Sequence, residues 1–175
     1  MRNTALIAFG FALLLLETSL AALLPLEPWW PMLVLPIVIY LGVAPDSNLL
    51  RGAAVSFVLG YLTDALSGSS MGPYTFVIVA TYMLSRAVRL RLLLRGPLFQ
   101  VLMTFVVTAL AGGMILALRA IFERGDDFPV MDVTTAVYRD LAPAFTTAIA
   151  SPFIFAAAQR IEELSGRRRD ERAVV

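Results

Sequence analysis

The stretch Gly60-Tyr-Leu-Thr-Asp64-Ala-Leu-Ser-Gly68-Ser-Ser-Met-Gly72-Pro73 lies between two apolar runs that are each long enough to cross a bilayer. It places one aspartate and three glycines at a four-residue step, and residues four apart share one face of a helix. Gly68 and Gly72 favour a break in that helix, while proline suits the first position of the next helix. The stretch predicts a corner between two helices, built on Gly60, Asp64, Gly68, Gly72 and Pro73.

The four-residue step also extends backwards from this corner. Small residues at this spacing make a smooth strip on an apolar helix and let another backbone approach closely. A second strip of the same kind occurs later in the chain. We favour packing within the chain's own bundle for both strips, and an interface with another protein is the alternative. The two strips are Gly52, Ser56 and Gly60, and Ala109, Gly113 and Ala117.

The composition indicates a membrane protein. Hydrophobic residues make up 59% of the 175 residues and charged residues 15%, whereas soluble domains are nearer half apolar and a quarter charged. Cysteine and histidine are both absent from the chain, which removes disulfides, thiolate or imidazole metal ligands and the commonest nucleophile–base pairs. We therefore expect no catalytic residues, no enzyme activity, no cofactor, no metal and no nucleic-acid partner.

Six apolar runs predict an all-α integral membrane protein, a bundle of six transmembrane helices within residues 1–160. The second run is short and contains Pro36. It is either a tilted, kinked span or a re-entrant segment, and we favour the span. Residues 161–175 are predicted to form a charged, disordered cytoplasmic tail. The expected spans are 4–24, 29–44, 49–66, 73–90, 98–121 and 133–158.

The distribution of arginine predicts the orientation, because positive charge marks the cytoplasmic side. All fourteen basic residues are arginine, and with six spans eleven of them fall on the side that holds both termini. Both termini are therefore expected in the cytoplasm of a multi-pass inner-membrane protein, where the arginines can also contact anionic lipid headgroups. The other three are Arg119, Arg124 and Arg139.

Charged residues inside apolar helices need a partner or a use. For Glu17 we favour a structural pairing with Arg139 or Arg119 over a ligand role. Asp64 either contacts a partner or ligand, or caps its helix at the interface. If it is structural, we expect it to accept backbone N–H groups near Gly68–Gly72. The predicted intramembrane charges are Glu17, Arg119, Arg139 and Asp140.

The pattern Gly60-x3-Asp64-x3-Gly68-x3-Gly72-Pro-Tyr, between the third and fourth of six short spans, resembles the hallmark corner of MreD, the rod shape-determining membrane protein family. Chain length, span number, the proline-rich second span and the arginine connector are similar as well. The resemblance implies a non-catalytic scaffold of the bacterial cell-elongation complex. Its partners would be the single-span protein MreC and, through the complex, the peptidoglycan polymerase RodA and a class B penicillin-binding protein.

The fold of that family is similar to the substrate-binding component of energy-coupling-factor vitamin transporters, which gives the alternative function. Those components carry a small-x3-small motif on the first span, and Ala8-x3-Ala12 fits it here. A vitamin pocket needs several converging polar or aromatic residues. The Trp29–Trp30 turn and the acidic loop 123–132 are candidate sources of them.

Overall fold

The computed structural model describes residues 2–23, 28–44, 48–67, 72–91, 96–122 and 133–173. Within these ranges every regular element is an α-helix, which confirms the helical class expected from the sequence. Proline is the first residue of both α4 and α5, where its missing N–H costs nothing. The helices are α1 (Arg2–Leu23), α2 (Val34–Val43), α3 (Leu49–Ser67), α4 (Pro73–Arg91), α5 (Pro97–Phe122) and α6 (Val133–Ala173).

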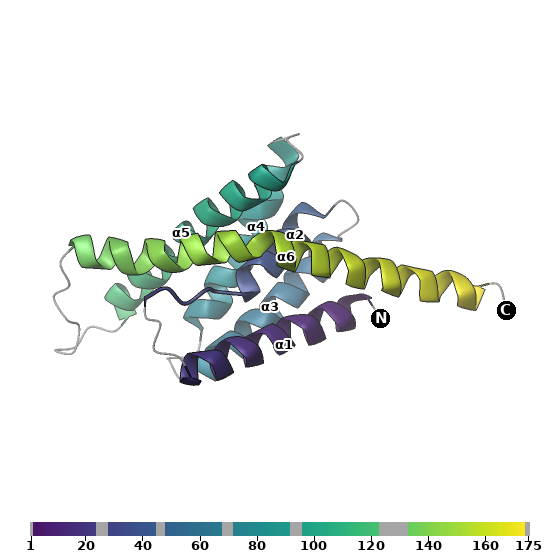
Figure 1. Cartoon of the computed structure of the whole chain (residues 1–175), viewed down its shortest axis with the longest axis horizontal. Helices are drawn as coiled ribbons and strands as arrows, with labels where there is room; N and C mark the ends of the chain where they lie inside the picture. The colour runs from purple at the N-terminus through teal and green to yellow at the C-terminus, as the bar shows by residue number, and fades with distance from the viewer. Residues whose placement is uncertain are drawn as a thin grey trace.

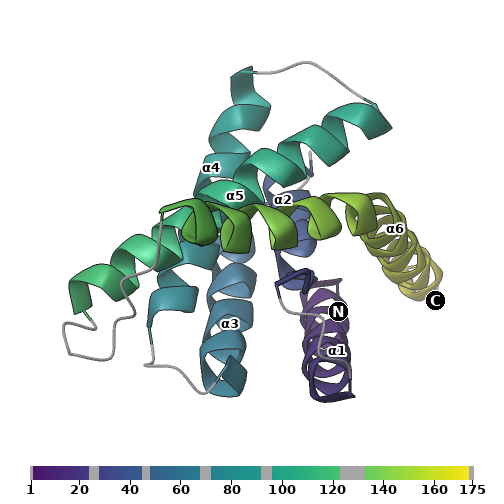
Figure 2. The same cartoon turned by 60° about the vertical axis from the view of Figure 1, so that its left-hand side comes forward.

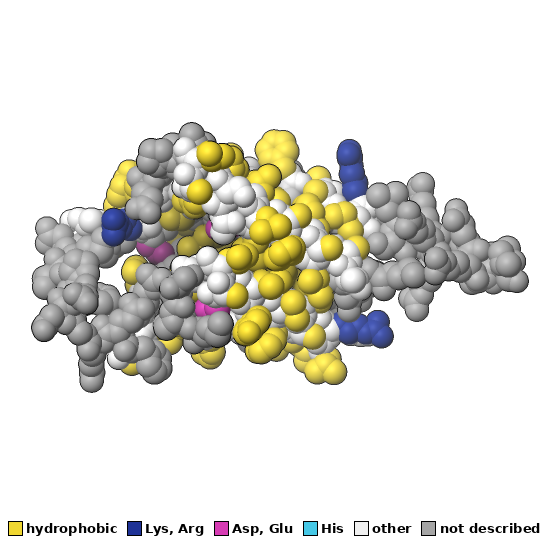
Figure 3. Space-filling view, turned by 90° about the horizontal axis from the view of Figure 1, so that it is seen from below, with side chains coloured by type: hydrophobic (Ala, Val, Ile, Leu, Met, Phe, Trp, Pro, Cys, Tyr) yellow, Lys and Arg dark blue, Asp and Glu magenta, His cyan; other side chains and the backbone are white. Residues whose placement is uncertain are grey.

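Among the described residues, four helices are long and apolar enough to cross a membrane: Thr4–Leu23, Leu49–Ser67, Leu98–Leu118 and Val137–Glu162. Large apolar side chains on their outer faces are exposed, among them Leu98 at 83% and Phe153 at 78%. Figure 3 shows apolar side chains over the middle of one face and arginine toward both ends of the long axis. Such a surface suits contact with lipid, because water would penalise it.

Helix α2 lies at the centre of the bundle, with the other helices around it (Figures 1 and 2). Nine of its ten residues are buried. Ten residues rise about 15 Å, which is roughly half of the hydrocarbon core. The helix is therefore much shorter than the expected span 29–44, and residues 29–32 before it are not helical. Pro31 explains part of this difference, because it disfavours helical backbone at the residue before it.

Helix α6 runs the full length of the molecule and contains Pro143 and Pro152. It does not stop at the predicted boundary of the bundle but continues to Ala173, into the segment 161–175 for which the sequence predicts a disordered tail. The physical reason lies in composition: this part of α6 has no proline and is rich in arginine and glutamate, which are good helix formers.

The helices pack in two close pairs, α3 with α4 and α5 with α6, and α2 lies against α4 and α6. Helix α1 packs on α3 and α6. The start of α1 and the end of α6 lie toward the same end of the long axis (Figure 1). The ends of α1 and α3 and the starts of α4 and α6 consequently gather at the opposite end, where the predicted corner lies.

Candidate functional site

The small-residue strip of α3 is buried against α4. Ser56 has no exposed surface, and Gly52 and Gly60 are buried as well. A Cβ atom on Gly60 would stand 2.7 Å from the Cα atom of Thr75, and one on Gly52 would overlap the Tyr82 ring. A side chain at Gly60 would push the α4 backbone away, and one at Gly52 would displace the Tyr82 ring, so the strip allows the two helices to lie close together.

Asp64 closes this helix pair at the corner. Its side chain is 2% exposed. Oδ1 accepts the backbone N–H of Tyr74 at 3.0 Å, and Oδ2 accepts that of Thr75 at 2.9 Å together with the Thr75 hydroxyl. These N–H groups belong to the first turn of α4, where no partner exists within the helix. Asp64 therefore caps α4 from a neighbouring helix, a few residues beyond the expected donors.

Gly72 is the residue directly before α4. Its φ of 124° lies in the region that favours glycine, because a Cβ atom would be strained there. Pro73 follows as the first residue of α4. Gly68 lies outside the described residues, as does the rest of 68–71. The structure thus brings Gly60, Asp64, Gly72 and Pro73 to one corner.

Glu17 makes a similar contact with α2. Its Oε2 atom accepts the backbone N–H of Leu33 at 3.1 Å, at the N-cap of α2. Next to it, the Thr147 hydroxyl accepts the N–H of Met32 at 2.9 Å. A helix that begins inside the bundle leaves N–H groups away from water, and these two side chains satisfy two of them.

The pairing expected for Glu17 is therefore wrong as far as Arg139 is concerned. The Arg139 side chain is exposed, and the structure records no ion pair between it and Glu17. The side chain of Arg119 lies outside the described part of the chain. Sequence reasoning treated the carboxylate as a charge that needs an opposite charge, whereas a buried carboxylate is equally well satisfied by backbone N–H groups.

The strip predicted on α5 is placed differently from the one on α3. Gly113 and Ala117 are exposed, Ala109 is half-buried, and nothing lies within 4 Å of a Cβ atom on Gly113. The close approach occurs at Gly112, where a Cβ atom would overlap the Asp140 carboxylate of α6. A different four-residue series on α5 faces the bundle and could have been read from the sequence: Thr104, Thr108 and Gly112.

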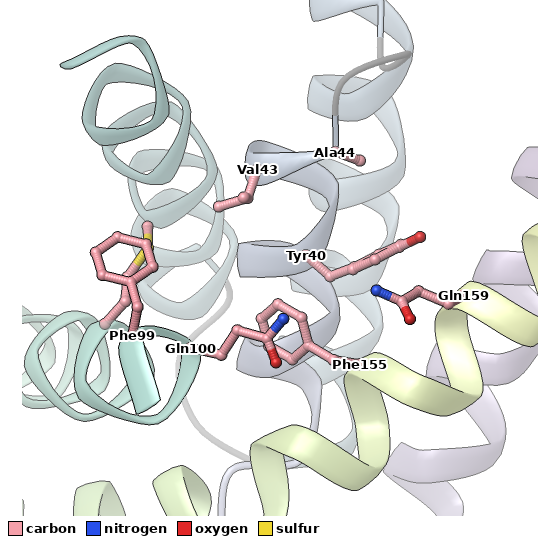
Figure 4. A pocket seen from close by; sticks show the side chains of 8 residues that line it. Tyr40, Val43, Ala44, Phe99, Gln100, Phe155 and Gln159 are labelled. Carbon is pink, nitrogen blue, oxygen red and sulfur yellow. The ribbon is translucent and has the colours of Figure 1, made fainter. Parts of the chain in front are cut away.

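Aromatic side chains make contacts at both ends of the bundle. Trp29, 44% exposed, packs edge-on against Tyr138 with ring centroids 5.9 Å apart. At the other end, a cavity of about 170 Å³ lies between α2, α5 and α6, and the Gln100 and Gln159 amides border it (Figure 4). The Tyr40 hydroxyl at this cavity donates to Glu162 at 2.7 Å.

The polar side chains described above bind the starts of α2 and α4 to neighbouring helices. Within the described ranges, no three acidic residues gather in a way that could hold a metal ion. The fold and the corner define an all-helical protein of membrane character with carboxylate-capped helices inside the bundle. No protein-family model matches the chain, and neither a curated protein nor a solved structure matches it.

Proposed function

We propose that this protein is a non-catalytic scaffold of the bacterial cytoplasmic membrane, of the MreD kind. In this proposal it is a subunit of the cell-elongation complex and binds the transmembrane helix of an MreC-like protein. It thereby supports peptidoglycan synthesis by RodA and a class B penicillin-binding protein. The proposal rests on the resemblance of the corner sequence, and the geometry of that corner supports a structural role for it.

The observation that carries the proposal is the convergence of the corner residues on the start of α4. Gly60 contacts the Thr75 backbone, and Asp64 accepts hydrogen bonds from that same residue and from Tyr74. The hydrogen-bond donors of the Asp64 carboxylate are therefore groups of this chain. Two residues of the pattern that resembles the family hallmark, Gly60 and Asp64, thus fix two helices relative to each other, as a scaffold requires.

The orientation is part of the proposal: six spans with both termini in the cytoplasm. The eleven-to-three arginine split supports it, as does the position of the start of α1 and the end of α6 at one end of the molecule. Single cysteines at Ser69, Asp126 and Ser165 test it in intact cells. The first two should react with an impermeant thiol reagent, and labelling at Ser165 would reject the orientation.

The surface we propose for the partner helix is the exposed strip of α5. Gly113 has open space around it, so a foreign helix can come close there without displacing a side chain. Gly113→Leu should reduce recovery of the MreC-like partner from detergent extract and leave folding intact. Leu110→Ala is the matched control, an exposed change on the same helix that adds no bulk.

Co-purification and depletion together test the function. Tagged protein should recover the MreC-like partner, and depletion in a rod-shaped host should give rounded cells. The vitamin-transporter alternative predicts recovery of a coupling subunit with ATPases, saturable vitamin binding and normal cell shape. That second set of results would replace the scaffold proposal.

A further inference from the structure

A cavity of about 320 Å³ lies in the half of the bundle that is opposite the start of α1 and the end of α6. Its walls are formed by residues of all six helices and of the segment that leads into α2. The wall is mostly apolar, with Leu14, Ile78 and Ile115 among its residues. The volume lies at the lower end of the range of small-molecule pockets, which starts near 300 Å³.

The cavity follows from the shortness of α2. Helix α2 fills the centre of the bundle only from Val34 onward, and the non-helical residues 29–32 precede it. A helix with its side chains is about 10 Å across, so a non-helical strand of chain leaves part of that cross-section unfilled. The side chains of the surrounding helices do not close the gap, and the cavity is the volume that remains.

Glu17 and Trp30 present polar groups to this mostly apolar space, whereas the Thr18, Thr63 and Ser67 hydroxyls at its wall already donate to backbone carbonyls. Glu17 lines the cavity, and only its Oε2 atom is used by the Leu33 N–H within the described residues. Trp30 also lines the cavity, and its Nε1–H is buried and finds no hydrogen-bond partner in the described part of the chain. A buried donor without a partner, beside a half-buried carboxylate that has an oxygen left to accept, favours a bound molecule that pairs with both, because leaving a buried polar group unpaired is costly.

We propose that this cavity binds one small amphiphile, with its apolar chain against the α3–α5 wall and a hydroxyl or ammonium group donating to Glu17 Oε1. A hydroxyl on the ligand can also accept from Trp30 Nε1–H. Lipid-derived alcohols and amines have this chemistry. The site goes beyond the proposed scaffold function and does not depend on it.

The two tryptophans of the chain allow a direct test, since bromine quenches tryptophan fluorescence on contact. Trp29→Phe leaves only Trp30, which lines the cavity, and Trp30→Phe leaves only the exposed Trp29. Purified protein in lipid nanodiscs is titrated with bromohexanol, bromohexylamine and bromohexane. The Trp30-only protein should be quenched saturably by the alcohol and the amine, about tenfold more tightly than by bromohexane.

Two further variants separate the site from the surrounding lipid. Ala21→Phe, at an exposed residue that lines the cavity, should abolish saturable quenching without adding a side chain to the packed core. Glu17→Gln keeps an acceptor for Leu33 and should weaken the amine more than the alcohol. Linear quenching of equal strength in both single-tryptophan proteins, or equal affinity for all three probes, would overturn the proposal. Loss of the MreC-like partner in pull-down would bear on the scaffold function alone.

Discussion

Thr75 donates its backbone N–H to the Oδ2 atom of Asp64 over 2.9 Å, so a carboxylate of α3 caps the first turn of α4. The partial positive charge at a helix N-terminus favours an anion at this position. The same Thr75 lies against Gly60, one turn before Asp64 on α3. Close packing and capping therefore act at one residue, and a change at either α3 position alters the corner.

We predict that Asp64→Leu destabilises the protein by about 3 kcal/mol or more, because two backbone donors and one hydroxyl lose their acceptor in a buried site. Asp64→Asn keeps one acceptor oxygen and should cost about half as much. Unfolding in a mixed-detergent titration measures both. Ala65→Leu, on the exposed side of the same helix, is the control and should change little. Equal losses for Asn and Leu would instead indicate a need for the negative charge itself.

The two glycine strips give opposite predictions for the same change. Gly60→Ala should lower stability by about 1–3 kcal/mol, because the new methyl group meets the Thr75 backbone, which cannot rotate away. Gly113→Ala should be neutral or stabilise by up to about 1 kcal/mol, because it fills open space and alanine suits a helix interior better. Thermal melting in detergent distinguishes them. A similar loss at both positions would mean that backbone approach is not what Gly60 provides.

Glu17 and Thr147 both hold the start of α2, so we predict that their contributions to stability are coupled. Glu17→Leu and Thr147→Val each remove an acceptor from a backbone N–H at the start of α2, and each should cost about 1–3 kcal/mol. Both act on the same helix start, so the double variant should cost less than the sum. Glu17→Gln should be mild, and exposed Ser19→Ala serves as the control. Strict additivity in a double-mutant cycle would contradict a shared role at α2.

Gly112 and Asp140 form a size-matched contact between α5 and α6. Gly112→Ala should destabilise by about 1–2 kcal/mol, since the carboxylate must leave its position beside α5. Removing that carboxylate with Asp140→Ala in the same chain should restore most of the loss. The same titration measures both variants. If Asp140→Ala does not restore the stability lost in Gly112→Ala, the strain lies elsewhere in the α5–α6 interface.

The sequence by itself determined the helical class and most helix ends. Long apolar runs fixed α1, α3 and α5, and Pro73 and Pro97 marked where α4 and α5 begin. The four-residue step also identified a face of α3 whose three members, Gly52, Ser56 and Gly60, are buried in the structure. These features are local, because helix length, proline geometry and residue spacing do not depend on what lies opposite.

Tertiary structure decided which faces meet and which groups pair. Gly112 packs whereas the adjacent Gly113 is exposed, and only the rotation of α5 against α6 separates them. A helix in lipid is apolar on both its lipid side and its packed side, so hydrophobic periodicity does not mark the buried face as it does in water. The same holds for Glu17, whose partner is the backbone of Leu33. Backbone N–H groups occur at every residue except proline, and only the start of α2 inside the bundle leaves this one free to donate to a carboxylate.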